Sequence, residues 1–301
     1  MRQSKLITVS LAAIVFLAAC GSDSSATSDT PVVKPRIVIS STTDPQSVLI
    51  AEIYGQALEK ASFRVARKKA SETSDALFAA VESGTVQITG ATAQELFAWT
   101  QSKAAASDAL PNTTALQTEA IAKNLPTTMK IGAASTAEDI DVIFCSATFT
   151  DANTIATLTD LGTKPGTATL AAPDGFDTAT PLGAATLKDT YQIEFKSVVP
   201  TPIDQTLEAV TSGTADCGVG RSGDPALAPV TLKILQDDKA VVPNNVLLPV
   251  LTADAATADV TAVLDATSAR LTTEQLRALN QRLVDGATPE LAANEFVGAG
   301  G

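Results

Sequence analysis

Short apolar runs alternate with amphipathic stretches along the first third of the chain. Strand-like segments at residues 36–40, 63–67 and 86–88 are separated by helical stretches at residues 45–61 and 74–83. Apolar residues in the helical stretches recur at the spacing of one helix face. Strands that alternate with helices are typical of a largely parallel sheet covered by helices. The pattern therefore predicts an α/β lobe that begins at residue 36.

Residue types at two helix starts support this interpretation. Asp44 precedes Pro45, which matches an N-cap followed by proline at the first helical position. Thr272 stands three residues before Gln275, the spacing of a capping box. Both positions therefore predict where a helix begins.

A second strand-and-helix series begins near residue 141. Its predicted strands are residues 141–145, 167–172, 195–199 and 215–220, and its predicted short helices are residues 155–161 and 207–213. No repeat of solenoid period is visible. This second series predicts a second α/β lobe within the same chain.

The first nineteen residues are typical of a bacterial targeting segment. Arg2 and Lys5 precede an apolar run that is too short to span a bilayer. The run ends in Leu-Ala-Ala-Cys-Gly, which resembles the lipobox of bacterial lipoproteins and predicts lipid on Cys20. The alternative is an ordinary secreted protein in which Cys20 is incidental. Residues 20–35, rich in small polar residues, are expected to form a flexible tether.

Charge and composition exclude several classes of function. Residues 1–19 hold two of the 21 basic residues and none of the 33 acidic ones, so removing them changes the net charge from −12 to −14. That charge argues against nucleic acid and against an anionic membrane surface as electrostatic partners. The chain contains no histidine, which excludes Ser/His/Asp and Cys/His hydrolases. No second apolar run reaches the length of a membrane-spanning helix.

Two cysteines remain once Cys20 is assigned to lipid. In an exported chain disulfides can persist, so the sequence predicts a disulfide between Cys145 and Cys217, with two separate buried thiols as the alternative. The chain has no CxxC pair and no histidine, so the sequence predicts no zinc or redox motif, no metal and no cofactor.

Several segments, in a consistent order, resemble the substrate-binding lipoproteins of osmoprotectant ABC importers, which handle glycine betaine, choline and carnitine. Residues 51–58 are similar to that family's first-helix pattern, and residues 79–84 to its short helix before the third strand. The segment that starts at Ala171-Ala172-Pro173 is similar to its second-lobe ligand loop. Further similar segments follow at residues 188–195, 235–239, 245–250 and 271–280.

The resemblance implies a two-lobed, type II periplasmic-binding-protein fold, with two α/β lobes joined by two crossover segments. Lobe one would comprise residues 36–140 plus 247–301, and lobe two residues 141–246. It also implies a small-molecule solute, a membrane permease as partner, and no enzymatic activity.

The sequence departs from this family where a quaternary ammonium would bind. Relatives that hold such cations usually surround them with aromatic rings. This chain has one tryptophan and two tyrosines, and we interpret Tyr54, Tyr191 and Trp99 as packing residues rather than as a cage. Ala179 stands where the resemblance would place an arginine of the second-lobe loop.

In open α/β lobes, ligands bind beyond the carboxyl ends of the strands and near helix N-termini. That rule selects polar residues after the predicted strands, with Arg221 as the best anion-facing group. They suit a polar or anionic solute better than a quaternary amine, although many could simply be turn and cap residues. The predicted ligand-binding residues are Thr42, Thr43, Gln46, Thr89, Thr92, Phe176, Asp177, Thr178, Arg221 and Ser222.

The leading hypothesis is an extracytoplasmic solute-binding lipoprotein of an ABC importer, for an osmoprotectant or a related small polar solute. The alternative is a surface lipoprotein that uses the same fold as an adaptor or structural partner and has no transported ligand. An exported enzyme that uses only carboxylates is disfavoured, because no paired-carboxylate motif is identifiable.

Overall fold

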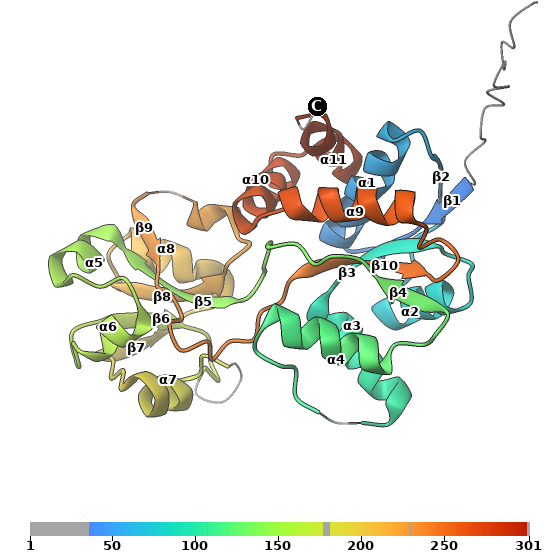
Figure 1. Cartoon of the computed structure of the whole chain (residues 1–301). Coiled ribbons are helices and arrows are strands. Elements are labelled where there is room, and N and C mark those ends of the chain that lie inside the picture. The colour runs from blue at the N-terminus through green and yellow to red at the C-terminus, as the bar shows by residue number, and fades with distance from the viewer. Residues whose placement is uncertain (1–35, 107, 177–180, 229, 300–301) are drawn as a thin grey trace, which may run out of the picture. The chain divides into compact units, whose positions relative to one another are not determined.

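The computed structural model describes residues 36–299 with the exceptions of 107, 177–180 and 229, and Figure 1 shows the chain. Two five-stranded sheets organise these residues. Their strand orders are β2-β1-β3-β10-β4 and β7-β6-β8-β5-β9. Each sheet and the helices that cover it form one α/β lobe, here called lobe one and lobe two. The chain enters lobe two after β4, at residues 132–140, and returns after β9, at residues 235–246.

Lobe one is built on a mixed sheet. Strand β1 pairs in parallel with β2 and β3, whereas β10 runs antiparallel to its neighbours β3 and β4. The strands are β1 (Arg36–Ile39), β2 (Arg64–Arg67), β3 (Ile88–Thr92), β4 (Met129–Ile131) and β10 (Leu247–Thr252). The helices are α1 (Pro45–Lys60), α2 (Ser74–Glu82), α3 (Ala93–Ala104), α4 (Thr114–Asn124), α9 (Ala258–Arg270), α10 (Thr273–Val284) and α11 (Pro289–Gly298).

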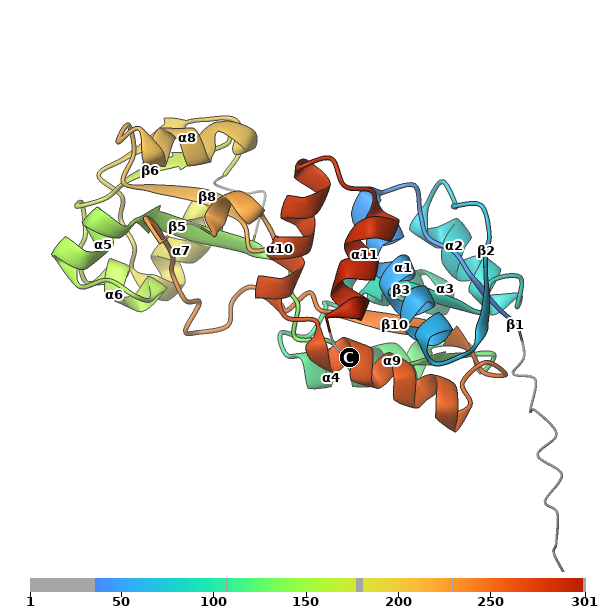
Figure 2. The same cartoon turned by 90° about the horizontal axis from the view of Figure 1, so that it is seen from above.

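Strand β10 is buried on both faces, as a central strand between two helical layers must be. Leu247 and Leu251 pack into the cluster formed with α1, α9, α10 and α11. Leu248 and Val250 point to the opposite cluster, which α2, α3 and α4 supply. Figures 1 and 2 show these two groups of helices on opposite sides of the sheet. The alternating side chains of one strand therefore serve two cores.

Lobe two has the same kind of mixed sheet. Strand β6 is parallel to β7 and β8, and β5 is antiparallel to β8 and β9. The strands are β5 (Asp141–Ser146), β6 (Thr169–Ala172), β7 (Ser197–Pro200), β8 (Cys217–Arg221) and β9 (Leu232–Ile234). The helices are α5 (Ala147–Asn153), α6 (Leu158–Gly162), α7 (Ala184–Tyr191) and α8 (Thr206–Thr211), with 3-10 turns η1 (Ile203–Gln205) and η2 (Pro225–Leu227).

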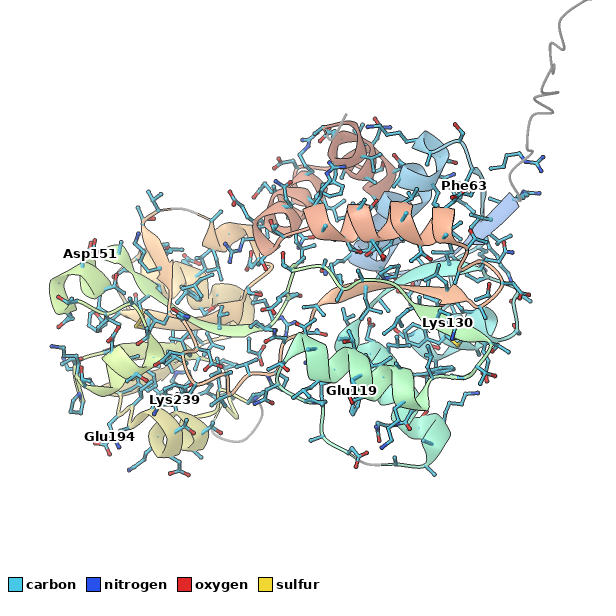
Figure 3. The ribbon with its side chains drawn as sticks, viewed as in Figure 1. Phe63, Glu119, Lys130, Asp151, Glu194 and Lys239 are labelled. Atoms are coloured by element: carbon cyan, nitrogen blue, oxygen red, sulfur yellow. A yellow bond between two sulfur atoms is a disulfide. The ribbon has the colours of Figure 1, made fainter. Side chains whose placement is uncertain are left out.

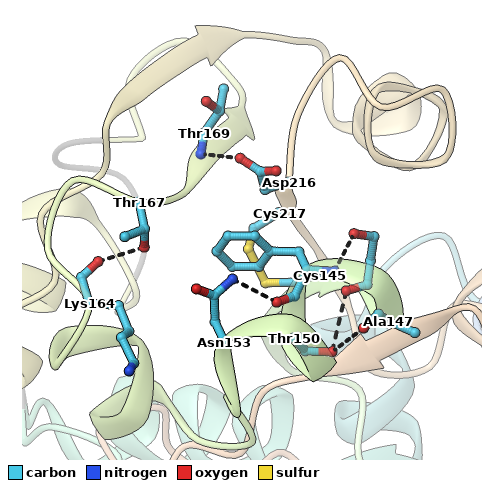
Figure 4. The surroundings of a disulfide bond; sticks show 11 residues. Cys145, Ala147, Thr150, Asn153, Lys164, Thr167, Thr169, Asp216 and Cys217 are labelled. Carbon is cyan, nitrogen blue, oxygen red and sulfur yellow. Dashed lines mark hydrogen bonds between the residues drawn. A yellow bond between two sulfur atoms is a disulfide. The ribbon is translucent and has the colours of Figure 1, made fainter.

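A disulfide joins Cys145 and Cys217 across the centre of lobe two (Figure 4). The two residues face each other in the β5–β8 ladder, and both side chains are fully buried. Next to the bond, the Asp216 carboxylate accepts a hydrogen bond of 2.8 Å from the Thr169 amide of β6. The disulfide and this bond therefore tie three neighbouring strands together.

Local sequence signals predicted six strands close to where they lie and one displaced strand, whereas several elements were not predicted, among them α3, α4, α9, β4 and β9. The third strand begins at Ile88 rather than ending there, and beside its start Val38 N of β1 donates to the side-chain Oε1 of Gln87 instead of to a main-chain carbonyl. Helix α5, which follows β5 directly, was not predicted. Its seven residues include only one that is fully buried, so they show no apolar periodicity.

The expected helix starts are confirmed at Asp44 and Thr272, whose side chains accept bonds from Ser47 N and Gln275 N. Among the helices of the described residues, none is long and apolar enough to cross a membrane.

Candidate functional site

A cavity of about 260 Å³ lies at the carboxyl ends of β1 and β3. The N-termini of α1 and α3 reach it, and so do the two crossover segments. Residues of both sheets contribute to its wall. The lining residues are Thr42, Asp44, Gln46, Ser47, Gly90, Ala91, Thr92, Gln94, Glu95, Asp139, Arg221, Asn245 and Leu247.

The segment between β1 and α1 forms one wall of the cavity. Asp44 caps α1 by accepting a bond of 2.9 Å from Ser47 N through Oδ1. The Ser47 hydroxyl accepts in turn from Thr42 N at 3.0 Å. These bonds fix a turn from which the side chains of Asp44 and Gln46 border the cavity. No hydrogen bond joins the Gln46 amide or Asp44 Oδ2 to another described residue.

The start of α3 forms another part of the wall. Thr92 and Glu95 make a capping box, in which each side chain accepts from the other residue's backbone amide. Glu95 also accepts a bond of 2.9 Å from the Ser74 hydroxyl. The second crossover segment is joined to this helix start, because Gln94 N donates to Asn245 Oδ1 at 3.0 Å. The Gln94 side chain itself has no bonded partner among the described residues.

Arg221, at the end of β8, reaches the cavity from lobe two. Its Nε donates to Asp139 Oδ1 at 3.2 Å, and its Nη1 to Asp141 Oδ1 at 3.0 Å. Its Nη2 donates to the Asp139 carbonyl. Partial burial acts to lower the pKa of Arg221, but these bonds and the two carboxylate charges outweigh it and raise the pKa. The guanidinium is therefore charged, and two carboxylates already compensate it.

A second cavity of about 280 Å³ adjoins the first on the other side of Arg221. The two cavities share Gln94, Asp139, Arg221 and Asn245 in their linings. The second one adds Asp141 and the apolar side chains of Leu110, Ile140 and Val242. The shared residues make one cleft with two compartments.

Comparison with known proteins places this geometry in a family. The pattern described as the substrate-binding domain of the ABC-type glycine betaine transport system matches residues 35–299. The chain belongs to this family. Its members are extracytoplasmic solute-binding proteins of ABC importers, a class of binding proteins rather than of enzymes. No curated protein matches the chain.

Solved structures similar to this chain confirm the two-lobed fold. One is described as a glycine betaine/carnitine/choline ABC transporter. Its sequence is 17% identical to this chain, the TM-score is 0.76, and the alignment covers 88% of this chain and 98% of the other. Another is apo YehZ from Escherichia coli, whose sequence is 19% identical to this chain. The TM-score is 0.75, and the alignment covers 88% of this chain and 99% of YehZ. At these identities the likeness establishes the fold, a two-lobed periplasmic binding protein.

Four of the ligand-binding residues that we predicted for this chain line the first cavity: Thr42, Gln46, Thr92 and Arg221. They share positions beyond strand ends or at helix starts, as the rule for open sheets predicts. The guanidinium of Arg221 forms ion pairs with Asp139 and Asp141, and its role as an anion-facing group stays a prediction. Asp177 and Thr178 lie outside the described residues.

Four other predicted residues do not line this cavity. Thr43 is exposed at the turn before α1. Thr89 is buried inside β3, because that strand begins later than predicted, and its hydroxyl donates to the Ser40 carbonyl at 2.8 Å. Phe176 packs in the core of lobe two.

The fourth, Ser222, is buried directly after β8, where its hydroxyl bonds to the first crossover segment by donating to Glu138 O and accepting from Ile140 N. It belongs to a contact between the lobes. Arg277 of α10 donates to the Ser222 carbonyl, and Asn280 donates to the Gly223 carbonyl at 2.9 Å. Thr273 of the same helix accepts from Glu138 N at 3.0 Å. Helix α10 of lobe one is therefore bonded both to the first crossover segment and to the loop after β8 in lobe two.

The aromatic residues pack elsewhere, as the sequence indicated. Tyr54 is buried in α1, and its hydroxyl shares a hydrogen bond of 2.9 Å with Ser268. Trp99 stacks edge-on against Phe78 in the core, with ring centres 5.6 Å apart. Tyr191 is buried in lobe two and donates to Asp237. Within the described part of the chain, neither cavity has an aromatic side chain in its lining.

Sequence reasoning missed Asp44, Gln94, Asp139 and Asn245 as lining residues. Asp44 was recognised only as a helix cap, and its position beside Thr42 could have suggested both roles. Asp139 and Asn245 lie in the crossover segments, whose approach to the cavity no local pattern encodes. No group of three His, Cys, Asp or Glu side chains among the described residues could hold a metal ion.

Glu138, in the first crossover segment, carries a testable pH dependence. Burial raises the pKa of its carboxyl above the ordinary value. The folded protein therefore binds an extra proton between the unfolded and folded pKa values, and stability falls as pH rises through that window. We expect Glu138→Gln to be more stable than the wild type near pH 7, with the difference vanishing near pH 4, below the usual Glu pKa of about 4.3.

Urea unfolding of the two proteins at both pH values checks this expectation. Glu119→Gln, at an exposed position of α4 labelled in Figure 3, is the matched control and should show no such pH-dependent gain. An equal or lower stability of Glu138→Gln near pH 7 would contradict a desolvated carboxylate at this position.

Proposed function

We propose that this protein is an extracytoplasmic solute-binding lipoprotein of an ABC importer, which holds a small polar solute in the cleft and presents it to a membrane permease. The supporting observation is the convergence of two helix N-termini and both crossover segments on one cavity. Groups from both sheets line that cavity, so a solute bound there would contact both lobes. An osmoprotectant or a related small solute fits the family and the size of the cavity.

The crossover segments are proposed to act as the hinge between residues 36–140 plus 247–301 and residues 141–246. They run side by side, since Glu138 and Val246 form an antiparallel bridge. Hinge closure around a ligand is a common motion of two-lobed binding proteins. Closure would bring Arg221 and its two carboxylates toward the α1 and α3 starts.

The proposed anchor lies outside the described residues. Residues 1–19 would be removed as a signal peptide, and residues 20–35 would link lipid on Cys20 to the folded part. Growth of the producing bacterium with radiolabelled palmitate should label the wild-type protein, and Cys20→Ala should remain unlabelled. Label retained by Cys20→Ala would rule out acylation at this cysteine.

The test of solute binding is a thermal-shift screen of residues 34–301, which form one compact unit. The panel contains betaines, choline, carnitine, amino acids, amines, polyols and small anions. A ligand present at about 100 times its Kd stabilises the folded state by about 2.7 kcal/mol. For a protein of this size that raises Tm by roughly 5–10 °C.

A saturable shift with one chemical class supports a solute-binding protein. A flat result across the whole panel, with the protein folded, would favour the alternative of an adaptor that binds no transported ligand. The observation that supports this alternative is that no aromatic side chain of the described residues lines the cleft.

A further inference from the structure

We propose that the solute is a small organic cation carrying N–H donors, a protonated amine or a guanidinium compound, rather than a quaternary ammonium or an anion. This inference rests on the proposed function, because it names the chemical class that the same cleft would accept.

The cleft carries an excess of negative charge. Its two compartments are lined by the carboxylates of Asp44, Glu95, Asp139 and Asp141, against the single guanidinium of Arg221 among the described lining residues. The partial positive charges of the α1 and α3 N-termini offset about half a charge each. The remaining field still attracts a cation and repels an anion.

Most of the side-chain oxygen atoms that are free to bind a ligand in the cleft belong to carboxylates, which only accept hydrogen bonds. Asp44, Asp139 and Asp141 each use only Oδ1 in bonds to described residues, which leaves three Oδ2 atoms without a partner there. The amides of Gln46 and Gln94 each add one carbonyl oxygen and one NH2 group, so they can accept as well as donate. Carboxylate oxygens form their strongest hydrogen bonds with charged N–H donors. A ligand that supplies such donors would bond to the free carboxylate oxygens of the compartment that it occupies.

A quaternary ammonium does not meet these requirements. It has no N–H to donate, and its recognition usually depends on the faces of aromatic rings. The aromatic side chains of α1 and α3, which are Tyr54, Phe97 and Trp99, are buried in the core and do not line the cleft. A methylated cation in this cleft would leave the carboxylate oxygens desolvated without hydrogen bonds, which is costly.

An anion is disfavoured by the same contacts. Arg221, which could pair with an anionic group, is held by Asp139 and Asp141. An anion would have to displace one of these carboxylates and then remain close to it. The compensated guanidinium is better described as an element that positions the two aspartates.

Calorimetric titration of residues 34–301 with matched solute pairs tests the inference. Ethanolamine and choline differ only in methylation of the nitrogen, and so do glycine and glycine betaine; agmatine and acetate extend the series to a guanidinium and an anion. We expect at least one N–H cation to bind, and its methylated counterpart, where it has one, to bind at least tenfold more weakly.

The variant Asp44→Asn separates charge from folding. Asparagine caps a helix as well as aspartate does, so α1 should be retained while one carboxylate is lost. We expect affinity for the N–H cation to fall about tenfold in Asp44→Asn. The control Asp151→Asn, at an exposed position of α5 on lobe two (Figure 3), should leave it unchanged.

The possible outcomes are distinguishable. Binding of choline or glycine betaine in preference to its unmethylated partner, or of acetate in preference to the amines, would overturn the cation inference and leave the solute-binding function intact. An unchanged affinity in Asp44→Asn would also overturn it. Failure of every solute in the panel and in the thermal-shift screen would overturn both proposals.

Discussion

Reduction of the Cys145–Cys217 disulfide is expected to lower the free energy of unfolding by about 4 kcal/mol. The two cysteines are 72 residues apart, and a cross-link that closes a loop of this length removes much of the conformational entropy of the unfolded chain. Losses of about 2–5 kcal/mol are typical when a native disulfide is removed. Equilibrium urea unfolding of residues 34–301 with and without a phosphine reductant measures the difference.

Use of a reductant avoids the cavity that a buried cysteine-to-alanine substitution would create. The double variant Cys145→Ala/Cys217→Ala serves as the control, since its unfolding curve should not respond to the reductant. A wild-type curve that is equally unresponsive would show that the two thiols are not linked in the protein, which was the alternative left open by the sequence.

Gly162→Ala is expected to destabilise lobe two by about 3 kcal/mol or more, the upper end of the usual effect of overpacking. Gly162 ends α6, and a Cβ built there would lie 1.8 Å from the Tyr191 carbonyl oxygen at the end of α7. The obstacle is backbone, so no side-chain rotation can relieve it. The two helices would have to separate, disturbing the burial of Tyr191 and its bond to Asp237.

Gly298→Ala is the matched control, because a Cβ at the end of α11 would meet no atom within 4 Å. Thermal and urea unfolding of both variants should show a large loss for Gly162→Ala and little change for Gly298→Ala. Equal stability of the two variants would contradict the close approach of α6 to α7.

The parts of the fold that could be predicted from the sequence are those that depend on contacts between residues close together in the chain. Asp44 and Thr272 start helices through hydrogen bonds within a single turn, and the apolar run of β5 is buried on both faces. Errors appeared where a tertiary contact decides. At the start of β3 the side chain of Gln87, not a main-chain carbonyl, accepts from Val38 N of β1. Helix α5 was missed for another reason, because it is short and buries only Thr150.

The site was harder to predict, for a related reason. A rule based on strand ends selected Thr42, Gln46 and Thr92, which do line the cavity. The rule works for these residues because each one lies within a few positions of a predicted strand end. The partners of Arg221 could not be found in this way. Asp139 lies 82 residues away, and only the pairing of β5 with β8 brings it to the guanidinium.

The most direct test of the central claim is whether blocking the cleft abolishes solute binding. Gln94 lines both compartments, so Gln94→Trp would fill the space between them. Ala98→Trp places the same side chain one turn later on an exposed position of α3 that lines neither compartment. With the solute identified by the screen, calorimetry should show a loss of affinity of at least about tenfold, or 1.4 kcal/mol, for Gln94→Trp and none for Ala98→Trp. Wild-type affinity in Gln94→Trp would contradict binding in this cleft.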